Sequence, residues 1–262
     1  MSNPVLIRNN VLAGRIVFVN GTDRSGKMET ANLVATFDNV EKHRMDNVFE
    51  LVPKLWELGK ISEDAAISFL RTEADIHLYE NMLGRNLNIR LEDMTSVYRY
   101  PDPGKYFVRL GMVEGDEAVA RVKREKPVFQ NTTHNSIGSL ELFVKAFDDV
   151  RIVHCVRNPV DVVCDLFERG FGHRIGSDPR EFQLTFDYDG VPVPLYAWEY
   201  RDEYVGLNDV ERIVCTLESS LKKDIVSFNN FSKPDDTPDE TPAPKPRPNC
   251  SPKLGGLSII PR

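Results

Sequence analysis

The chain has 262 residues, of which 41% are hydrophobic and 28% are charged, a composition typical of a globular protein. This length suffices for one well-buried α/β domain. The net charge of −7 argues against general binding of nucleic acid, because the phosphate backbone attracts basic surfaces. We therefore expect no nucleic-acid partner, and the sequence leaves the oligomeric state open.

No targeting signal is visible in the chain. Residues 1–16 lack the basic start and long apolar stretch of a secretory signal, and no run approaches the roughly 18 apolar residues of a membrane helix. The four cysteines form no CxxC pair, and Cys155 and Cys215 lie in apolar runs that indicate core positions. These features predict a cytoplasmic protein without a membrane partner.

Strands and helices alternate along the first half of the chain. Residues 15–19 form a short β-branched run that predicts a buried strand ending in a tight turn. Helical periodicity follows over 28–37 and over 61–85, where Ser62 can cap the helix start. A second strand is expected at 127–130, before a helix over 137–147.

The second half begins with the most strand-like run, residues 151–156. Pro159 suits the first turn of a helix that reaches Glu168. Residues 212–215 predict a fourth strand before a closing helix.

Other segments are predicted to be loops or extended chain. Residues 182–195 contain Asp189-Gly190 and predict a surface hairpin or lid, and we expect a similar loop at 95–104. Seven prolines between residues 232 and 252 predict an extended or disordered tail. The expected organisation is thus one domain over 1–231, followed by a proline-rich tail over 232–262.

This order of elements predicts an α/β fold with a parallel β-sheet flanked by helices. Ligands of such sheets bind at the carboxyl ends of the strands. The segments that follow the predicted strands are 21–27, 131–135 and 157–161. We expect them to converge on one site.

A glycine-rich loop follows the first strand and matches the first seven positions of the P-loop pattern GxxxxGK[ST]. Glycines let backbone N–H groups wrap a phosphate, and the following helix offers its positive end. Met28 stands where the pattern has a Ser or Thr for Mg²⁺, and Thr30 comes two residues late. The expected nucleotide contacts are Gly21, Thr22, Asp23, Arg24, Ser25, Gly26, Lys27 and Met28.

A second motif, Arg157-Asn158-Pro159-Val160-Asp161, follows the strand at 151–156. Together with Arg24-Ser25-Gly26 it resembles the sulfotransferases that use 3′-phosphoadenylyl sulfate. The resemblance implies a P-loop fold of sulfotransferase type, with the phosphosulfate on the loop and the 3′-phosphate on Arg157. Asp165 stands at the position of a serine that shares this contact, and we include it in the expected cofactor site.

The same resemblance implies the catalytic residues. Thr133-His134 stands 23 residues before Arg157, where many cytosolic members carry a Thr-His pair whose histidine is the base. His134 would deprotonate the acceptor. Lys27 is a second expected catalytic residue on the ground of the glycine-rich loop itself, because its charge can follow the terminal phosphate or sulfate. No metal ligand is expected, in agreement with Met28.

Two other functions stay open. A nucleoside or nucleotide kinase using ATP and Mg²⁺ is favoured by Lys27, Asp23 and Ser25, and opposed by Met28. A degenerate P-loop protein that acts as an interaction partner would explain Met28 and Asp165. For the leading function, the expected partners are the nucleotide and an unidentified hydroxyl or amine acceptor. The segments 86–110 and 170–207, rich in Tyr, Phe and Arg, are expected to build the acceptor pocket.

Overall fold

The structure is a computed structural model that describes residues 4–231 and 257–260. Its main sheet has the order β2-β1-β3-β6 and consists of β1 (Arg15–Gly21), β2 (Phe129–Thr133), β3 (Asp149–Cys155) and β6 (Leu257–Ile260). β1 pairs in parallel with β2 and β3, whereas β6 pairs antiparallel with β3. The predicted α/β fold with a parallel sheet flanked by helices is confirmed at this level.

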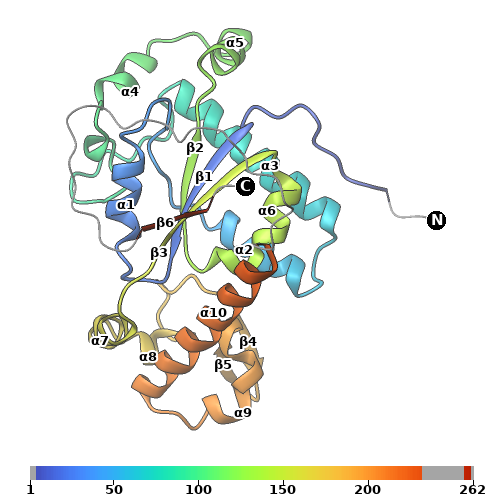
Figure 1. Cartoon of the computed structure of the whole chain (residues 1–262), viewed down its shortest axis with the longest axis vertical. Coiled ribbons are helices and arrows are strands. Elements are labelled where there is room, and N and C mark those ends of the chain that lie inside the picture. The colour runs from blue at the N-terminus through green and yellow to red at the C-terminus, as the bar shows by residue number, and fades with distance from the viewer. Residues whose placement is uncertain (1–3, 232–256, 261–262) are drawn as a thin grey trace.

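Helices cover both faces of the sheet (Figure 1). Those from the first half are α1 (Lys27–Val34), α2 (Val48–Glu57), α3 (Glu63–Met82), α4 (Gly104–Arg109), α5 (Asp116–Glu125) and α6 (Leu140–Ala146), with 3-10 turns η1 (Val97–Arg99) and η2 (Ser136–Ser139). The second half adds α7 (Pro159–Glu168), α8 (Phe171–Arg174), the hairpin β4 (Thr185–Tyr188) and β5 (Val191–Pro194), η3 (Leu195–Tyr200), α9 (Arg201–Tyr204) and α10 (Asp209–Phe231).

The alternation along β1 explains this layering. Ile16 and Phe18 belong to the larger apolar core, which also includes buried residues of α2, α3 and α6. Val17 and Val19 point to the other face and pack with Ala31 of α1. A strand that is apolar on both faces must be covered on both, and β1 is therefore the central strand.

Several predicted elements are confirmed with small shifts at their ends. α7 spans the predicted residues, and the Asn158 side chain caps it by accepting a hydrogen bond from the Val160 backbone N–H at 3.0 Å. β2 begins two residues later and ends three residues later than expected, because its polar residues are buried. Most of these polar groups are bonded internally: the Thr133 hydroxyl donates to Asn20 Oδ1 at 3.2 Å, whereas Gln130 Oε1 is buried without a hydrogen-bond partner.

The fourth strand predicted at 212–215 is wrong, because these residues lie inside α10. Ile213, Leu217, Ser220 and Asp224 are its buried residues and recur at helical spacing. A run of four residues with apolar character does not distinguish a strand from a buried helix face. The residues predicted as a strand are thus part of the apolar face of a long helix.

The two expected loops differ in outcome. The hairpin at 182–195 is confirmed as β4–β5, and Asp189 and Gly190 both have positive φ in its turn, as tight hairpins favour. The segment 95–104 is not a lid-like loop, because it forms η1 and buries Val97 and Tyr100.

The second half of the chain positions the site. α7–α10 and the hairpin lie beyond the carboxyl ends of the parallel strands (Figure 1). Of the tail expected at 232–262, the structure describes only β6; the proline-rich part lies outside the described residues, and the domain boundary at 231 stays a prediction. Among the helices of the described ranges, none has the length and apolar character needed to cross a bilayer.

Candidate functional site at the carboxyl edge of the sheet

The predicted glycine-rich loop joins β1 to α1, as expected. Gly21 ends β1 beside the end of β3, and a Cβ added there would lie 2.7 Å from the carbonyl oxygen of Cys155. Glycine is therefore the residue that this strand contact allows. Gly26 has φ of 87° directly before α1, a left-handed conformation that glycine adopts without strain. The loop thus brings the backbone to the start of α1.

Lys27 begins α1 and turns its side chain back into the loop. The residue is buried, and its Nζ donates to the Thr22 carbonyl at 3.1 Å and lies 3.9 Å from Asp23. Burial lowers the pKa of the ammonium, although Asp23 and Glu50 oppose this shift. Lys27 thus lies inside the loop, where a bound phosphate would place its charge.

Met28 and Thr30 occupy the positions that follow. The Thr30 hydroxyl donates to the Gly26 carbonyl at 3.1 Å, so it is already bonded to the helix backbone. The Ser25 hydroxyl is buried without a hydrogen-bond partner beside Gly21. A buried hydroxyl without a partner in such a loop is suited to a ligand oxygen.

The two predicted phosphate motifs meet at the edge of this loop. Arg157 Nη1 donates to the Arg24 carbonyl at 3.0 Å and to Asp165 Oδ2 at 2.6 Å. Arg24 Nε lies 3.4 Å from the same Asp165 oxygen. We call Arg24, Arg157 and Asp165 the arginine cluster. Its side chains are 28–42% exposed, so a ligand can reach it from solvent.

His134 follows β2 and lies between two carboxylates. Its Nε2 is 3.0 Å from Asp23, and its Nδ1 is 2.9 Å from Glu50, which also accepts the His134 backbone N–H at 2.8 Å. Burial disfavours the charged imidazole, but the two carboxylates outweigh it and raise the pKa of His134 to about 9. We call Asp23, His134 and Glu50 the histidine trio.

The protonation of the trio follows from this geometry. Burial also opposes ionisation of Asp23, but His134 and Lys27 outweigh it and hold the pKa of that carboxyl far below its usual range. Near pH 7 the imidazole is therefore a cation between two acceptors. This differs from the expectation of a free histidine base, because a protonated imidazole cannot accept another proton.

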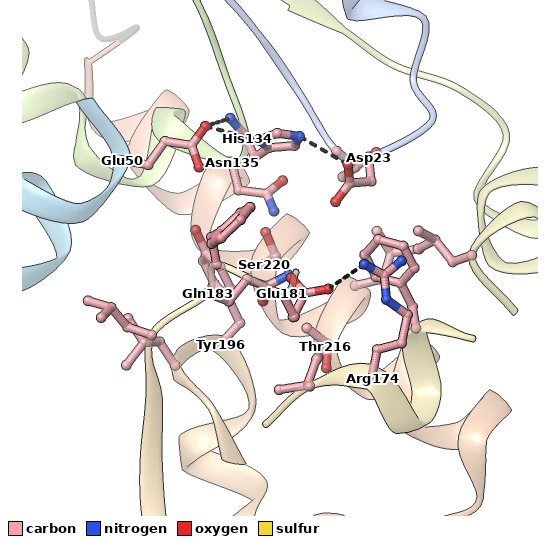
Figure 2. A pocket seen from close by; sticks show the side chains of 18 of the residues that line it. Asp23, Glu50, His134, Asn135, Arg174, Glu181, Gln183, Tyr196, Thr216 and Ser220 are labelled. Carbon is pink, nitrogen blue, oxygen red and sulfur yellow. Dashed lines mark hydrogen bonds and ion pairs between the residues drawn. The ribbon is translucent and has the colours of Figure 1, made fainter. Parts of the chain in front are cut away.

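A cavity of about 260 Å³ opens directly beside the trio (Figure 2). The loop, the start of α2 and the end of β2 form one wall, and α8, η3 and α10 form the other. Its polar lining includes Thr22, Asp23, Glu50, Lys54, His134, Asn135, Arg174, Glu181, Gln183, Tyr196, Thr216 and Ser220. This volume lies just below the range usual for drug-sized ligands and suits a small molecule.

Only one of the two predicted acceptor segments lines the cavity. The segment 170–207 contributes Phe171, Arg174, Glu181 and Tyr196 among others, whereas 86–110 contributes none of the lining residues in the described part of the chain. Tyr106 instead donates a hydrogen bond to Glu41 at 2.6 Å inside a separate buried cluster. The expectation for 86–110 is therefore wrong for this cavity.

Several polar atoms of the cavity wall have no partner. Ser220 is 1% exposed, and its hydroxyl makes no hydrogen bond. The side-chain oxygen of Asn135 is also buried without a hydrogen-bond partner.

Lys54 of the same wall donates to the Ser139 hydroxyl at 3.2 Å and has its Nζ over the Tyr196 ring, and burial lowers the pKa of its ammonium to about 8. Groups of this kind can orient a polar ligand.

Sequence reasoning missed Glu50, Lys54 and the lining residues of α10. A signal for α2 was present, because Phe49, Val52 and Trp56 recur at helical spacing and its buried face includes Phe49 and Val52. The contact between Glu50 and His134 spans 84 positions and has no local signature. Only the fold brings these two residues together.

Within the described part of the chain, one group of possible metal ligands is found, and it lies outside the cavity lining. Asp46, Glu73 and His77 have ligand atoms within 4.8 Å of one another. Arg44 donates to Nδ1 of His77, so the proton of the ring is on Nε2, which lies 2.5 Å from Asp46 and 3.2 Å from Glu73. Because Nε2 of His77 is engaged as a donor, we interpret Asp46, Glu73 and His77 as an ion-pair network.

Comparison with known proteins adds no family assignment. No protein-family model matches the chain, and a search of curated proteins finds no significantly similar relative.

Proposed function

We propose that the chain transfers a sulfuryl group from 3′-phosphoadenylyl sulfate, held at the loop from Gly21 to Lys27, to a hydroxyl or amine acceptor in the cavity. The observation that carries this proposal is the meeting of the two phosphate motifs, in which Arg157 donates to the Arg24 carbonyl at 3.0 Å. Adjacent parallel strands bring them to one edge, beside the N-terminus of α1.

The cations of this edge would act on the leaving group. In the transfer, the acceptor atom attacks sulfur, the bond from sulfur to the bridging oxygen breaks, and the electron pair stays on the departing phosphate. Of these cations, Lys27 lies inside the loop, where the phosphosulfate would bind together with the backbone N–H groups at the start of α1. Charges that are fixed before the reaction stabilise it without reorganisation at the moment of transfer.

The acceptor proton would pass to a carboxylate of the trio. His134 is a cation near pH 7, and its charge holds the pKa of Asp23 low, which makes Asp23 a poor proton acceptor. Glu50 binds His134 through Oε1 and lines the cavity. We assign Glu50 as the base and His134 as the positioning residue that orients it, in place of the base expected at His134.

A kinase reaction with Mg²⁺ and ATP is the second candidate, and the burial of Lys27 in the loop favours it. Two observations oppose it. Met28 has no oxygen ligand for Mg²⁺, and the Thr30 hydroxyl is bonded to Gly26. A degenerate P-loop protein would bind neither nucleotide productively.

Calorimetry with adenosine 3′,5′-bisphosphate in EDTA, and separately with Mg–ATP, distinguishes these functions. We expect the bisphosphate to bind without metal, and Lys27→Ala to weaken it. Arg15→Ala is the matched control, because Arg15 lies at the opposite end of β1 and pairs with Asp149. Binding of Mg–ATP alone would establish the kinase, and binding of neither would favour the interaction protein. A transfer assay with labelled donor and a panel of alcohols and amines then tests the chemistry.

A further inference from the structure

Asp165 joins the two phosphate motifs in the free protein. It lies on α7, and a single oxygen, Oδ2, is 2.6 Å from Arg157 Nη1 and 3.4 Å from Arg24 Nε. One carboxylate oxygen therefore occupies both arginines that border the loop. A phosphate oxygen of a bound nucleotide would need the same donors.

The charges around these arginines are already balanced. Asp161 lies one helical turn before Asp165, and its negative charge also acts on Arg157. Asp165 pairs with both arginines and the charge of Asp161 also acts on Arg157, which leaves little net positive charge for a dianionic phosphate. On the loop itself, the charge of Asp23 is compensated by His134 and Lys27.

The contact is also exchangeable. The side chains of Asp165, Arg157 and Arg24 are 28%, 36% and 42% exposed, and ion pairs of this exposure contribute little to stability. A ligand can displace Asp165 without disturbing the core. It must, however, compete with a carboxylate that is tethered at the site.

We propose that Asp165 is an internal competitor for the ribose-side phosphate of the nucleotide. It occupies Arg157 and Arg24 when the site is empty and remains beside them when it is filled. The 3′-phosphate therefore adds little affinity, and nucleotides with and without this group bind with similar strength. This inference rests on the proposed function, because it assumes that a nucleotide binds at the loop from Gly21 to Lys27.

The test compares adenosine 5′-monophosphate with adenosine 3′,5′-bisphosphate in the intact chain and in Asp165→Asn. We expect the two dissociation constants of the unchanged protein to agree within about threefold. In Asp165→Asn the bisphosphate should bind about 3–10-fold more tightly, while the monophosphate changes little. Asp165→Ser should act in the same direction. Glu168→Gln is the control, because it removes the charge of an exposed carboxylate of the same helix.

The outcomes are distinct. Binding of the bisphosphate more than tenfold tighter than the monophosphate by the unchanged protein would overturn the role of Asp165 and leave the proposed function standing. If Glu168→Gln tightened binding of the bisphosphate as much as Asp165→Asn, the effect would be one of net charge alone, and this result would also overturn the role of Asp165. If neither nucleotide binds any variant, the proposed function fails and the inference falls with it.

Discussion

The histidine trio and the arginine cluster lie on two sides of the same loop, and they differ in how far water reaches them. In the trio, the side chains of His134, Glu50 and Asp23 are 23%, 19% and 36% exposed, and the pKa of the central imidazole rises to about 9. In the arginine cluster, both arginines are 36–42% exposed and share one carboxylate oxygen. Charges withdrawn from water fix one another's protonation, whereas exposed pairs are weak and exchange partners.

The difference suggests a division of labour. The trio lies against the cavity and is suited to proton transfer, because its charge state is set by the protein. The arginine cluster is suited to ligand binding, because its contacts can be replaced by those of a nucleotide. Each of the following experiments tests one side of this division against the other.

The largest effect is expected for Glu50→Gln. If Glu50 accepts the proton, turnover should fall by about 10²–10⁴-fold, the usual contribution of a positioned base. Binding of the bisphosphate should change little, since Glu50 belongs to the cavity wall rather than to the arginine cluster. Steady-state kinetics and calorimetry measure both quantities, with the exposed Glu141→Gln as control. Full turnover in Glu50→Gln would remove Glu50 as the base.

Arg157→Ala should have the opposite profile. It removes the closer cationic partner of Asp165, so this carboxylate would repel the bisphosphate, and we expect the dissociation constant of the bisphosphate to rise by about 10-fold. Turnover at saturating nucleotide should fall much less. A variant that binds normally but turns over slowly would contradict the division between the two groups.

How far the sequence predicts this site depends on the range of the contacts. The loop after β1 and the cap of α7 are local patterns, and the structure contains both where the sequence indicates them. The parallel pairing of β1 and β3 then places Arg157 beside Arg24, as the order of elements implied. Contacts of this kind follow from fold rules that the sequence makes visible.

The chemistry of His134 could not be predicted in the same way. Its two partners come from the loop and from α2, and the sequence offers no pattern that links Glu50 to it. Without these carboxylates, the ordinary pKa of histidine suggested a neutral base. The error at 212–215 has a similar origin, because Ile213 and Leu217 of α10 are buried by packing against α7.

A smaller effect is expected in the pH dependence of stability. The pKa of His134 is raised on folding, so its stabilising contribution is complete below about pH 6.5 and is lost as pH rises towards 9. Lys42 and Lys54, whose pKa values burial lowers to about 8, contribute in the opposite sense above that value. The measurement is therefore the difference between the intact chain and His134→Gln.

We expect the stability advantage of the intact chain over His134→Gln to shrink by about 1–3 kcal/mol between pH 6.5 and 9. Denaturant unfolding at a series of pH values gives this difference. A constant difference would show that His134 is not held as a cation. A matching series on Asp165→Asn should show no such trend, since the arginine cluster has no group that titrates in this range.

The smallest effect is expected from removal of the C-terminal tail. β6 pairs with β3 from Ile152 to Cys155, and Cys155 lies two residues before Arg157. The trio is supported by β1, β2 and α2, which do not pair with β6. If β6 helps to hold the end of β3, the loss of β6 should disturb the arginine cluster and leave the trio unchanged.

Two truncations separate β6 from the segment before it: one chain ends at residue 256 and the other at residue 231. We expect both to fold, because β1, β2 and β3 retain their pairing, and to bind the bisphosphate at most about threefold more weakly, a change below 1 kcal/mol. The pH signature of His134 should persist in both. Equal losses in the two chains would assign the effect to β6, whereas a loss only in the shorter chain would assign it to residues 232–256. A large fall in melting temperature with loss of the His134 signature would show that β6 supports the whole sheet, and the two ionic groups would then not be independent.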